Sequence, residues 1–409
     1  MNRRNLVLIL SAVMLFSSCA AQQENADIIS ASSKDSAEET QSIVTVAESE
    51  DNAPEQDDSP SEINETVCYA YPYYVLDSAK QELYRSMYAA VADMSDELEF
   101  RAGSAPTLED VKYIYQLLHN DEPMFFNTSG HFSYKEYPDG TIRVIAFTYL
   151  YDKQTYLSRA AEIDTAMDEI LSAVDDNASD AEKVKYFHDS LIKNCAYERG
   201  ENCNNIYGAF VEHKAMCQGY SKAFSLLCSK VGINSLTVLG STGDTEHMWN
   251  KVCLDGDYYN VDVTWDDPED ESYPDYVKYE FFCLDDESLS DRHTEDGNYY
   301  PIPAAKGRKY YYYSYNDLIA DSYDSAKELI LRCIDNDSGN DDKICVQLQA
   351  SDETVYDELV TKLFGADKGI GELTRIISDA GTEIDTSHID YIINNNRHTI
   401  KIFLNRKKA

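Results

Sequence analysis

One stretch near the middle of the chain constrains the fold most, because a helix there is followed directly by two strands that a tight turn must join. From Cys217 to Gly232 the apolar residues recur at helical spacing, which predicts a buried helix that begins at the cysteine and ends at the glycine. Residues 246–252 and 258–265 are rich in β-branched and aromatic side chains, and an Asp-Gly pair between them is a strong hairpin signal. The stretch therefore predicts a helix packed on an antiparallel sheet.

The predicted hairpin brings a histidine and an aspartate to the same face of the sheet. With Asp255 and Gly256 as the turn, Asp262 faces Trp249 and lies diagonal to His247. Moving the turn by one residue shifts the pairing by two, so both side chains stay on that face. We therefore expect the carboxylate of Asp262 to lie within reach of the imidazole of His247.

These positions form a Cys–His–Asp arrangement that suits acyl transfer. The N–H groups and the dipole at a helix N-terminus favour a thiolate at Cys217 and are able to hold a developing oxyanion. His247 is the candidate proton shuttle, and Asp262 is the candidate residue that fixes its tautomer and stabilises its charged form. His188 and His213 are alternative bases, because one lies on the preceding helix and the other precedes the cysteine by four residues.

Four motifs in this region resemble those of the bacterial transglutaminase-like superfamily, over roughly residues 180–300. They are, in chain order, Cys217-Gln218-Gly219-Tyr220, Val231-Gly232-Ile233, His247-Met248-Trp249-Asn250-Lys251-Val252 and Tyr259-Asn260-Val261-Asp262-Val263-Thr264-Trp265-Asp266-Asp267-Pro268. The resemblance implies an α+β, papain-like core in which a helix packs on an antiparallel sheet.

The same resemblance implies roles for individual residues. Cys217, His247 and Asp262 carry over as the catalytic triad, and no metal or organic cofactor is required. The candidate substrate-site residues are Gln218, Tyr220 and Trp249. The sequence departs from the family pattern at three positions, which are His213 and Lys214, where glycine is frequent, and Ser221, where alanine is frequent.

The resembling region is flanked by two stretches with their own periodic patterns. We expect a catalytic domain at 176–305 between two smaller α+β modules, at 65–175 and at 306–409. Helical spacing and capping signals predict helices at 77–100, 107–119, 155–174, 179–194, 322–334, 351–364 and 371–379. Alternation and turn residues predict strands at 131–137, 141–151, 310–313, 343–349, 387–394 and 398–405.

The N-terminus has the pattern of an export signal. Two arginines precede an apolar run that is too short to span a bilayer as a mature helix, and small residues lead to Cys19. Residues 1–19 resemble a bacterial lipoprotein signal, which implies a lipid on Cys19; an ordinary secretory signal is the alternative. Residues 20–64 are acidic and poor in apolar side chains, which predicts a disordered tether. We therefore expect an exported bacterial protein, lipid-anchored to the cell membrane and facing the extracellular side.

The charge of the chain argues against nucleic acid as a partner. Its 35 Lys and Arg face 74 Asp and Glu, which gives a formal net charge of −39 and no basic face in bulk. The acidic stretch 335–339 has its glycine one step early for a calcium-binding loop, so a solvated turn is the better interpretation. Cys195 and Cys203 are able to pair in an oxidising compartment, and the sequence leaves that pairing open.

Together these features predict a cell-surface cysteine enzyme that forms an acyl-enzyme from an amide of a protein or peptide, cell-wall peptides included. Hydrolysis and amine transfer both fit this chemistry. One alternative is a cysteine peptidase that acts on envelope peptides. Another is a non-catalytic surface binding protein in which the flanking modules bind and the triad is vestigial.

Overall fold

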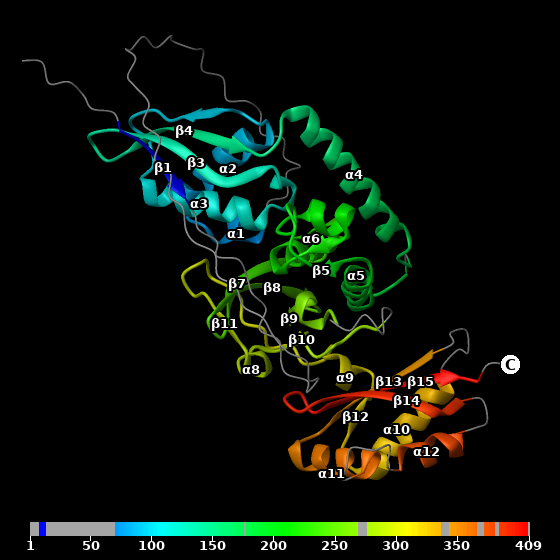
Figure 1. Cartoon of the computed structure of the whole chain (residues 1–409). Helices are drawn as coiled ribbons and strands as arrows, with labels where there is room; N and C mark the ends of the chain where they lie inside the picture. Colours follow the sequence, from blue (N-terminus) through cyan, green and yellow to red (C-terminus); the bar gives the residue numbers. More distant parts are fainter. Residues whose placement is uncertain are drawn as a thin grey trace, which may run out of the picture.

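The computed structural model describes residues 8–13, 70–175, 177–268, 276–336, 343–365, 372–380 and 384–407. Over these residues the chain forms three sheets of four or five strands, one after another along the sequence. Figure 1 shows them as a cyan N-terminal part, a green and yellow central part, and an orange and red C-terminal part. The fold is α+β, as the sequence predicts.

The N-terminal sheet has the strand order β1-β3-β4-β2 and contains the first predicted hairpin. The strands are β1 (Leu8–Val13), β2 (Glu97–Glu99), β3 (Thr128–Glu136) and β4 (Ile142–Tyr149). The prediction of two strands around residues 138–140 is confirmed, and the Asp139 carboxylate accepts the Thr141 N–H in the turn. Strand β1 comes from the apolar N-terminal run and pairs antiparallel with β3 at one edge of the sheet.

Helices α1 (Tyr71–Val75), α2 (Ser78–Ala92) and α3 (Leu108–Asp121) accompany this sheet. The helix at 107–119 is confirmed, and its predicted cap is present because the Thr107 hydroxyl accepts the Asp110 N–H. The predicted helix at 77–100 is too long. It ends near Met94, whose φ of 55° belongs to the left-handed region, and the remaining residues form β2.

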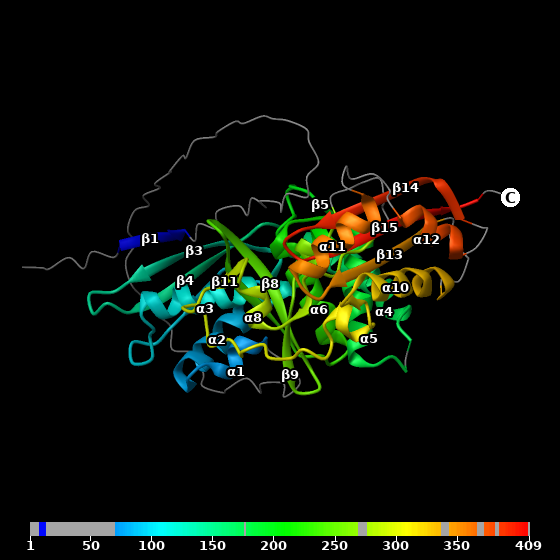
Figure 2. The same ribbon diagram turned by 90° about the horizontal axis from the view of Figure 1, so that it is seen from below.

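The central sheet has the strand order β10-β9-β8-β7-β11 and is antiparallel throughout. Its strands are β7 (Ser235–Thr242), β8 (Thr245–Leu254), β9 (Asp257–Val261), β10 (Phe282–Leu284) and β11 (His293–Glu295). Helix α6 (Cys217–Lys230) packs on β7 and β8, so the predicted helix on an antiparallel sheet is confirmed. Seen from below in Figure 2, β8 and β9 run long across the middle of the molecule beside α6.

The hairpin of β8 and β9 has the predicted register but a shorter second strand. Leu254 pairs with Asp257 and Asn250 pairs with Val261, as a turn at Asp255-Gly256 requires. The predicted strand at 258–265 is wrong beyond Val261, because the chain turns there into the short helix α7 (Val263–Asp266).

The N-terminal and central parts share their hydrophobic cores. Helices α4 (Lys153–Ser172) and α5 (Asp180–Asn194) match their predicted positions, and α5 begins with the predicted Ser179–Glu182 capping box. Ile163 of α4 packs in one core with Phe224 of α6. A second core joins side chains of both parts, among them Tyr84, Ile114, Phe147, Val238 and Trp249.

The C-terminal sheet has the strand order β12-β13-β15-β14, with helices α10, α11 and α12 together on one side in Figure 1. The bounds are β12 (Ile319–Ala320), α10 (Tyr323–Asn336), β13 (Lys343–Ala350), α11 (Glu353–Phe364), α12 (Leu373–Ala380), β14 (Ile384–Asn394) and β15 (Thr399–Arg406). The sequence predicts all of these elements except the two-residue strand β12. The buried Lys401 ammonium of β15 forms an ion pair with the buried Glu280 carboxylate, which ties this sheet to the central part.

The predicted strand at 310–313 is wrong, because Tyr312–Tyr315 forms the helical turn α9. The helical turn points consecutive tyrosines in different directions. The Tyr312 ring stacks on Tyr279 with 3.7 Å between centroids, and Tyr313 is fully buried.

Several predictions concern residues outside the described ranges. Cys19, the tether at 20–64 and most of the acidic stretch 335–339 belong to this group. No helix among the described residues is both long enough and apolar enough to cross a membrane.

Candidate active site

Cys217 is the first residue of helix α6. The preceding residue, Met216, has an extended backbone with φ −104° and ψ −178°, so the helix begins abruptly at the cysteine. Gly219 allows the loop around Cys203 to lie against this helix end, since a Cβ at Gly219 would lie 2.4 Å from the Cys203 carbonyl oxygen. The backbone around the sulfur is therefore tightly packed at a helix N-terminus, where N–H groups favour an anion.

Polar contacts fix α6 against the strand that carries the histidine. The Ser221 hydroxyl donates to the Trp249 carbonyl oxygen at 3.1 Å. In return, Asn250 Nδ2 donates to the Ser221 carbonyl oxygen at 3.1 Å and to Ser225 Oγ at 3.2 Å. These buried bonds hold the cysteine helix in one register on β8. The hydroxyl of Ser221, which replaces a frequent alanine, is part of this junction.

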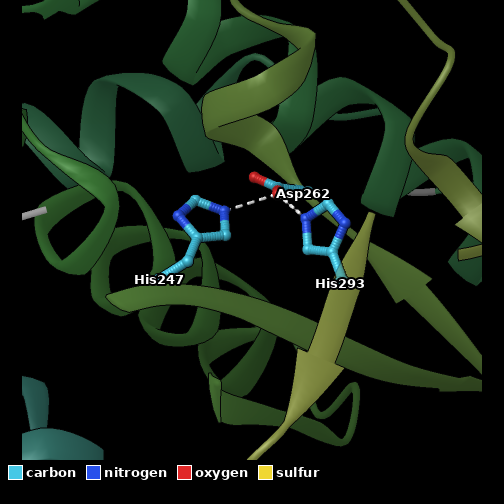
Figure 3. A group of neighbouring side chains, drawn as sticks. All are labelled: His247, Asp262 and His293. Atoms are coloured by element: carbon cyan, nitrogen blue, oxygen red, sulfur yellow. Dashed lines mark hydrogen bonds and ion pairs between the residues drawn. The ribbon is translucent and has the colours of Figure 1, made fainter. Parts of the chain in front are cut away.

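His247 and Asp262 meet as the sequence predicts, although the strand geometry differs. His247 Nε2 lies 2.6 Å from Asp262 Oδ2, and the two residues are 5% and 1% exposed. Asp262 follows the last residue of β9 and caps α7, because its Oδ1 accepts the Trp265 N–H at 3.1 Å. The helix cap thus orients one carboxylate oxygen and leaves the other for the imidazole, as Figure 3 shows.

The charges at this pair reinforce each other. Burial by itself would lower the pKa of His247, but the Asp262 carboxylate and the Cys217 thiol outweigh burial and raise that pKa to about 10. Burial would likewise raise the pKa of Asp262, but the charges and hydrogen bonds of His247 and His293 lower it below its usual range. His247 therefore holds its proton at neutral pH between a carboxylate and a thiol. Because Nε2 faces Asp262, Nδ1 is the ring nitrogen available to the sulfur.

Cys217 is itself almost covered, with 3% of its surface exposed. It belongs to a small buried cluster with Cys203, Met216 and Met248, against which Tyr197 and Leu239 pack. We call these six residues the thiol cluster. The thiol cluster therefore leaves little of Cys217 open to a substrate. The thiols of Cys195 and Cys203, whose pairing the sequence leaves open, are free in the structure.

The three predicted substrate-site residues lie in different surroundings. Gln218 follows the cysteine and is partly exposed, so it is available to a substrate. Tyr220 is fully buried in the core, where its hydroxyl donates toward the Cys195 carbonyl oxygen at 2.9 Å and Asp267 Oδ2 at 2.5 Å. Trp249 is 1% exposed and lies against His247, with 6.0 Å between ring centroids. Tyr220 and Trp249 therefore support the site from inside.

The sequence gives no indication of one member of the site, His293. Its Nε2 lies 2.8 Å from Asp262 Oδ2, so two imidazoles meet one carboxylate oxygen in Figure 3. His293 lies on the short edge strand β11, which pairs with β7. A three-residue strand that pairs with one some 50 residues earlier has no local periodicity, so no sequence pattern announces this residue.

The same three side chains form the one group with potential metal ligands found among the described residues. A tetrahedral zinc ion with bonds of about 2.0–2.1 Å keeps its ligand atoms roughly 3.3 Å apart. The separations of 2.6 and 2.8 Å at Asp262 Oδ2 are shorter and match hydrogen bonds. This geometry favours a hydrogen-bonded relay of His247, Asp262 and His293 over a metal centre.

The two alternative bases lie elsewhere. His188 is fully buried between two carboxylates, with Nδ1 3.0 Å from Asp189 Oδ1 and Nε2 3.2 Å from Asp266 Oδ2. His213 is exposed and ends the π-helix Gly208–Glu212 with a φ of 56°. His188 therefore anchors the far end of α7, four residues after Asp262.

Residues 166–263, which are 98 of the 409 residues, match the family model described as the Transglutaminase-like superfamily. This segment is thus similar to transglutaminase-like domains. The match supports a family of cysteine enzymes for this segment, and it contains Cys217, His247 and Asp262. Among curated proteins, none is similar enough in sequence to be matched with the chain.

Solved structures with some similarity include a TGase, at 16% identity and a TM-score of 0.25 over 42% of this chain and 50% of that one. A candidate cysteine protease from Cytophaga hutchinsonii has 14% identity and a TM-score of 0.22 over 30% and 51% of the two chains. Menin, in a structure that reveals its binding site for the Mixed Lineage Leukemia protein, has 11% identity and a TM-score of 0.26 over 77% and 62%. This chain thus spans about half the length of the first two of these structures.

Proposed function

We propose that this protein is a cysteine enzyme that forms a thioester with the acyl group of a protein or peptide amide. The observation that carries the proposal is the buried His247, which is hydrogen-bonded to Asp262 and interacts with the Cys217 thiol on its other side. Among the described residues, His188, which is buried between two carboxylates, has no thiol partner of this kind. The transglutaminase-like match of the segment supports the same chemistry.

In the proposed reaction the Cys217 thiolate attacks the carbonyl carbon, and the N–H groups at the start of α6 are placed to stabilise the oxyanion. The His247 imidazolium gives its proton to the leaving amine as the C–N bond breaks, which leaves a thioester and a neutral imidazole. Water or a primary amine then attacks the thioester, and His247 takes the proton from it. The C–S bond breaks, which releases the acyl product and restores the Cys217 thiolate beside the His247 imidazolium. Asp262 holds the ring in one tautomer throughout.

The test is selective labelling of the full-length protein with a small thiol reagent such as iodoacetamide. We expect Cys217 to react first at pH 7, and the change His247→Ala to slow that reaction by at least about 10-fold, since the imidazolium that stabilises the thiolate is lost. His119→Ala is the matched control, because His119 is a half-buried imidazole with its Nδ1 bonded to Thr128. Equal, slow labelling of all thiols would favour the binding protein with a vestigial triad.

Hydrolysis and amine transfer are separated by the acceptor. We expect a labelled primary amine to be incorporated into glutamine-containing peptides if the thioester is resolved by transfer, and Cys217→Ala to abolish incorporation. Continued peptide cleavage without incorporation would favour a cysteine peptidase that acts on envelope peptides. The acidic character of the chain supports neutral or basic peptides as substrates.

We further propose export and lipid attachment at Cys19, which the cationic start and apolar run of the N-terminus support. Under this proposal the edge strand β1 belongs to the signal and is absent from the mature protein. In a bacterial host, a radioactive fatty acid should label the protein, and the change Cys19→Ser should remove the label. Persistence of an unlabelled, fully secreted protein would favour the ordinary secretory signal.

A further inference from the structure

His293 is held at the carboxylate that orients His247. It lies on β11, where it pairs with Thr242 of β7, and its Nε2 is 2.8 Å from Asp262 Oδ2. The same oxygen is 2.6 Å from His247 Nε2, while the other oxygen accepts the Trp265 N–H at 3.1 Å. Both oxygens of the Asp262 carboxylate are thus engaged, and Oδ2 is shared by two histidines.

The surroundings of His293 fix its protonation. The residue is 5% exposed, and its Nδ1 has no hydrogen-bond partner among the described residues. Burial lowers the pKa of His293, the positive charges of His247 and Arg397 act in the same direction, and Asp262 opposes them without reversing the shift. The ring is therefore neutral at pH 7, and its single N–H is the one at Nε2 that Asp262 accepts.

Aromatic rings prevent His293 from turning away. The centroids of Trp265, Trp249 and Phe281 lie 4.9, 5.0 and 5.6 Å from its own. The Arg397 guanidinium from the C-terminal part lies over the Phe281 ring, 4.5 Å from its centroid. A flipped imidazole would lose the bond to Asp262, so the packing and the hydrogen bond select one orientation.

We propose that His293 is a positioning residue that holds Asp262 Oδ2 toward His247 and, by sharing the charge on that oxygen, limits how strongly His247 retains its proton. The inference deepens the proposed function and rests on it. A neutral second donor draws negative charge away from His247, so the imidazolium is less stable than beside Asp262 alone. This arrangement favours the release of the His247 proton to the leaving amine in each catalytic cycle. The ionisable groups that face the relay are Cys217 beside His247 and Arg397 beside His293.

The test compares His293→Leu, which removes the donor, with His293→Gln, whose amide nitrogen reaches the position of Nε2. Nitrogen-15 NMR of histidine-labelled full-length protein follows the titration of His247, which His247→Ala assigns. We expect the titration midpoint of His247 to be ~1 pH unit higher in the leucine variant. One hydrogen bond to an ionised group contributes a free energy equivalent to about that shift. The glutamine variant should restore the wild-type midpoint.

A merely structural role gives a different pattern. It would lower the thermal stability of both variants and leave the His247 midpoint unchanged, which would overturn the inference. His119→Leu is the matched control, because His119 is half-buried and its pKa responds to burial, Lys222 and His131 and not to Asp262. If the leucine variant does not fold, the wild-type spectrum decides: a His293 ring protonated on both nitrogens at pH 7 would contradict the proposal.

The two proposals fail separately. If wild-type His247 titrates near its ordinary 6.5 and His247→Ala leaves Cys217 labelling unchanged, the proposed function itself is refuted. If the wild-type pair is coupled but the leucine variant titrates like wild type, only the role of His293 is refuted.

Discussion

Replacing Asp262 by Asn tests the electrostatics of the site most directly, because asparagine keeps the shape and removes the charge. Asparagine is a good N-cap, so the bond from the Trp265 N–H and helix α7 should survive. The pKa of His247 rises from 6.5 to about 10 in the folded protein, largely through Asp262. At 1.36 kcal/mol per pH unit this corresponds to roughly 5 kcal/mol, which is an upper limit for the pair. Both side chains are at least 97% buried, so solvent screening is weak.

The expected result is a fall in the His247 titration midpoint from near 10 to 6.5 or below, measured by histidine NMR. At pH 8 the protonated fraction then falls from about 99% to about 3%, so any step that needs the imidazolium slows by roughly 30-fold from protonation alone. The free energy of unfolding of the wild type should exceed that of the variant by its full amount from about pH 4 to 6.5. This difference should disappear as pH rises through about 10. An unchanged midpoint in Asp262→Asn would refute the reasoning, and Asp139→Asn, in an exposed turn, is the control.

Further predictions concern packing and the chemistry of the sulfur. Cys217→Ser should reduce any acyl-transfer activity by at least about 10³-fold while leaving the thermal midpoint nearly unchanged, as activity and calorimetry would show. Gly240→Ala should destabilise the fold by about 1–3 kcal/mol and displace β11, because the new Cβ would lie 2.2 Å from the Thr294 carbonyl oxygen. Urea unfolding measures this loss, and Gly297→Ala is the control because the space around Gly297 is open. Lys401→Met should cost about 3–5 kcal/mol because it leaves a buried carboxylate unpaired, and adding Glu280→Gln should recover most of that loss.

Local signals were sufficient for most of the fold. The start of α6 at Cys217, the turn at Asp255-Gly256 and the Ser179–Glu182 capping box depend on residues close together in the chain, and all three are confirmed. Two of the failures concern stretches that were predicted as strands. Residues 262–265 and 310–313 have strand-like composition, but a capping carboxylate and stacked tyrosine rings favour helical turns there.

The site was predictable in part for the same reason. The pairing of His247 with Asp262 follows from the hairpin register and survives the early end of β9, because the two side chains were already on one face. The bond from His293 to Asp262 joins residues 31 positions apart through a short edge strand. Contacts of that kind depend on tertiary packing, which no sequence period encodes.

The common interior of the N-terminal and central parts has a practical consequence. The segment that matches the family model, residues 166–263, does not include Ile163, although Ile163 packs in the same core as α6. Two residues of the segment, Val238 and Trp249, belong to a second core that also contains Tyr84 and Phe147 from outside the segment. A fragment limited to residues 166–263 would expose apolar side chains to water, and we expect it to aggregate rather than fold. Substitutions in the surrounding parts therefore reach the packing around the candidate active site through the shared core.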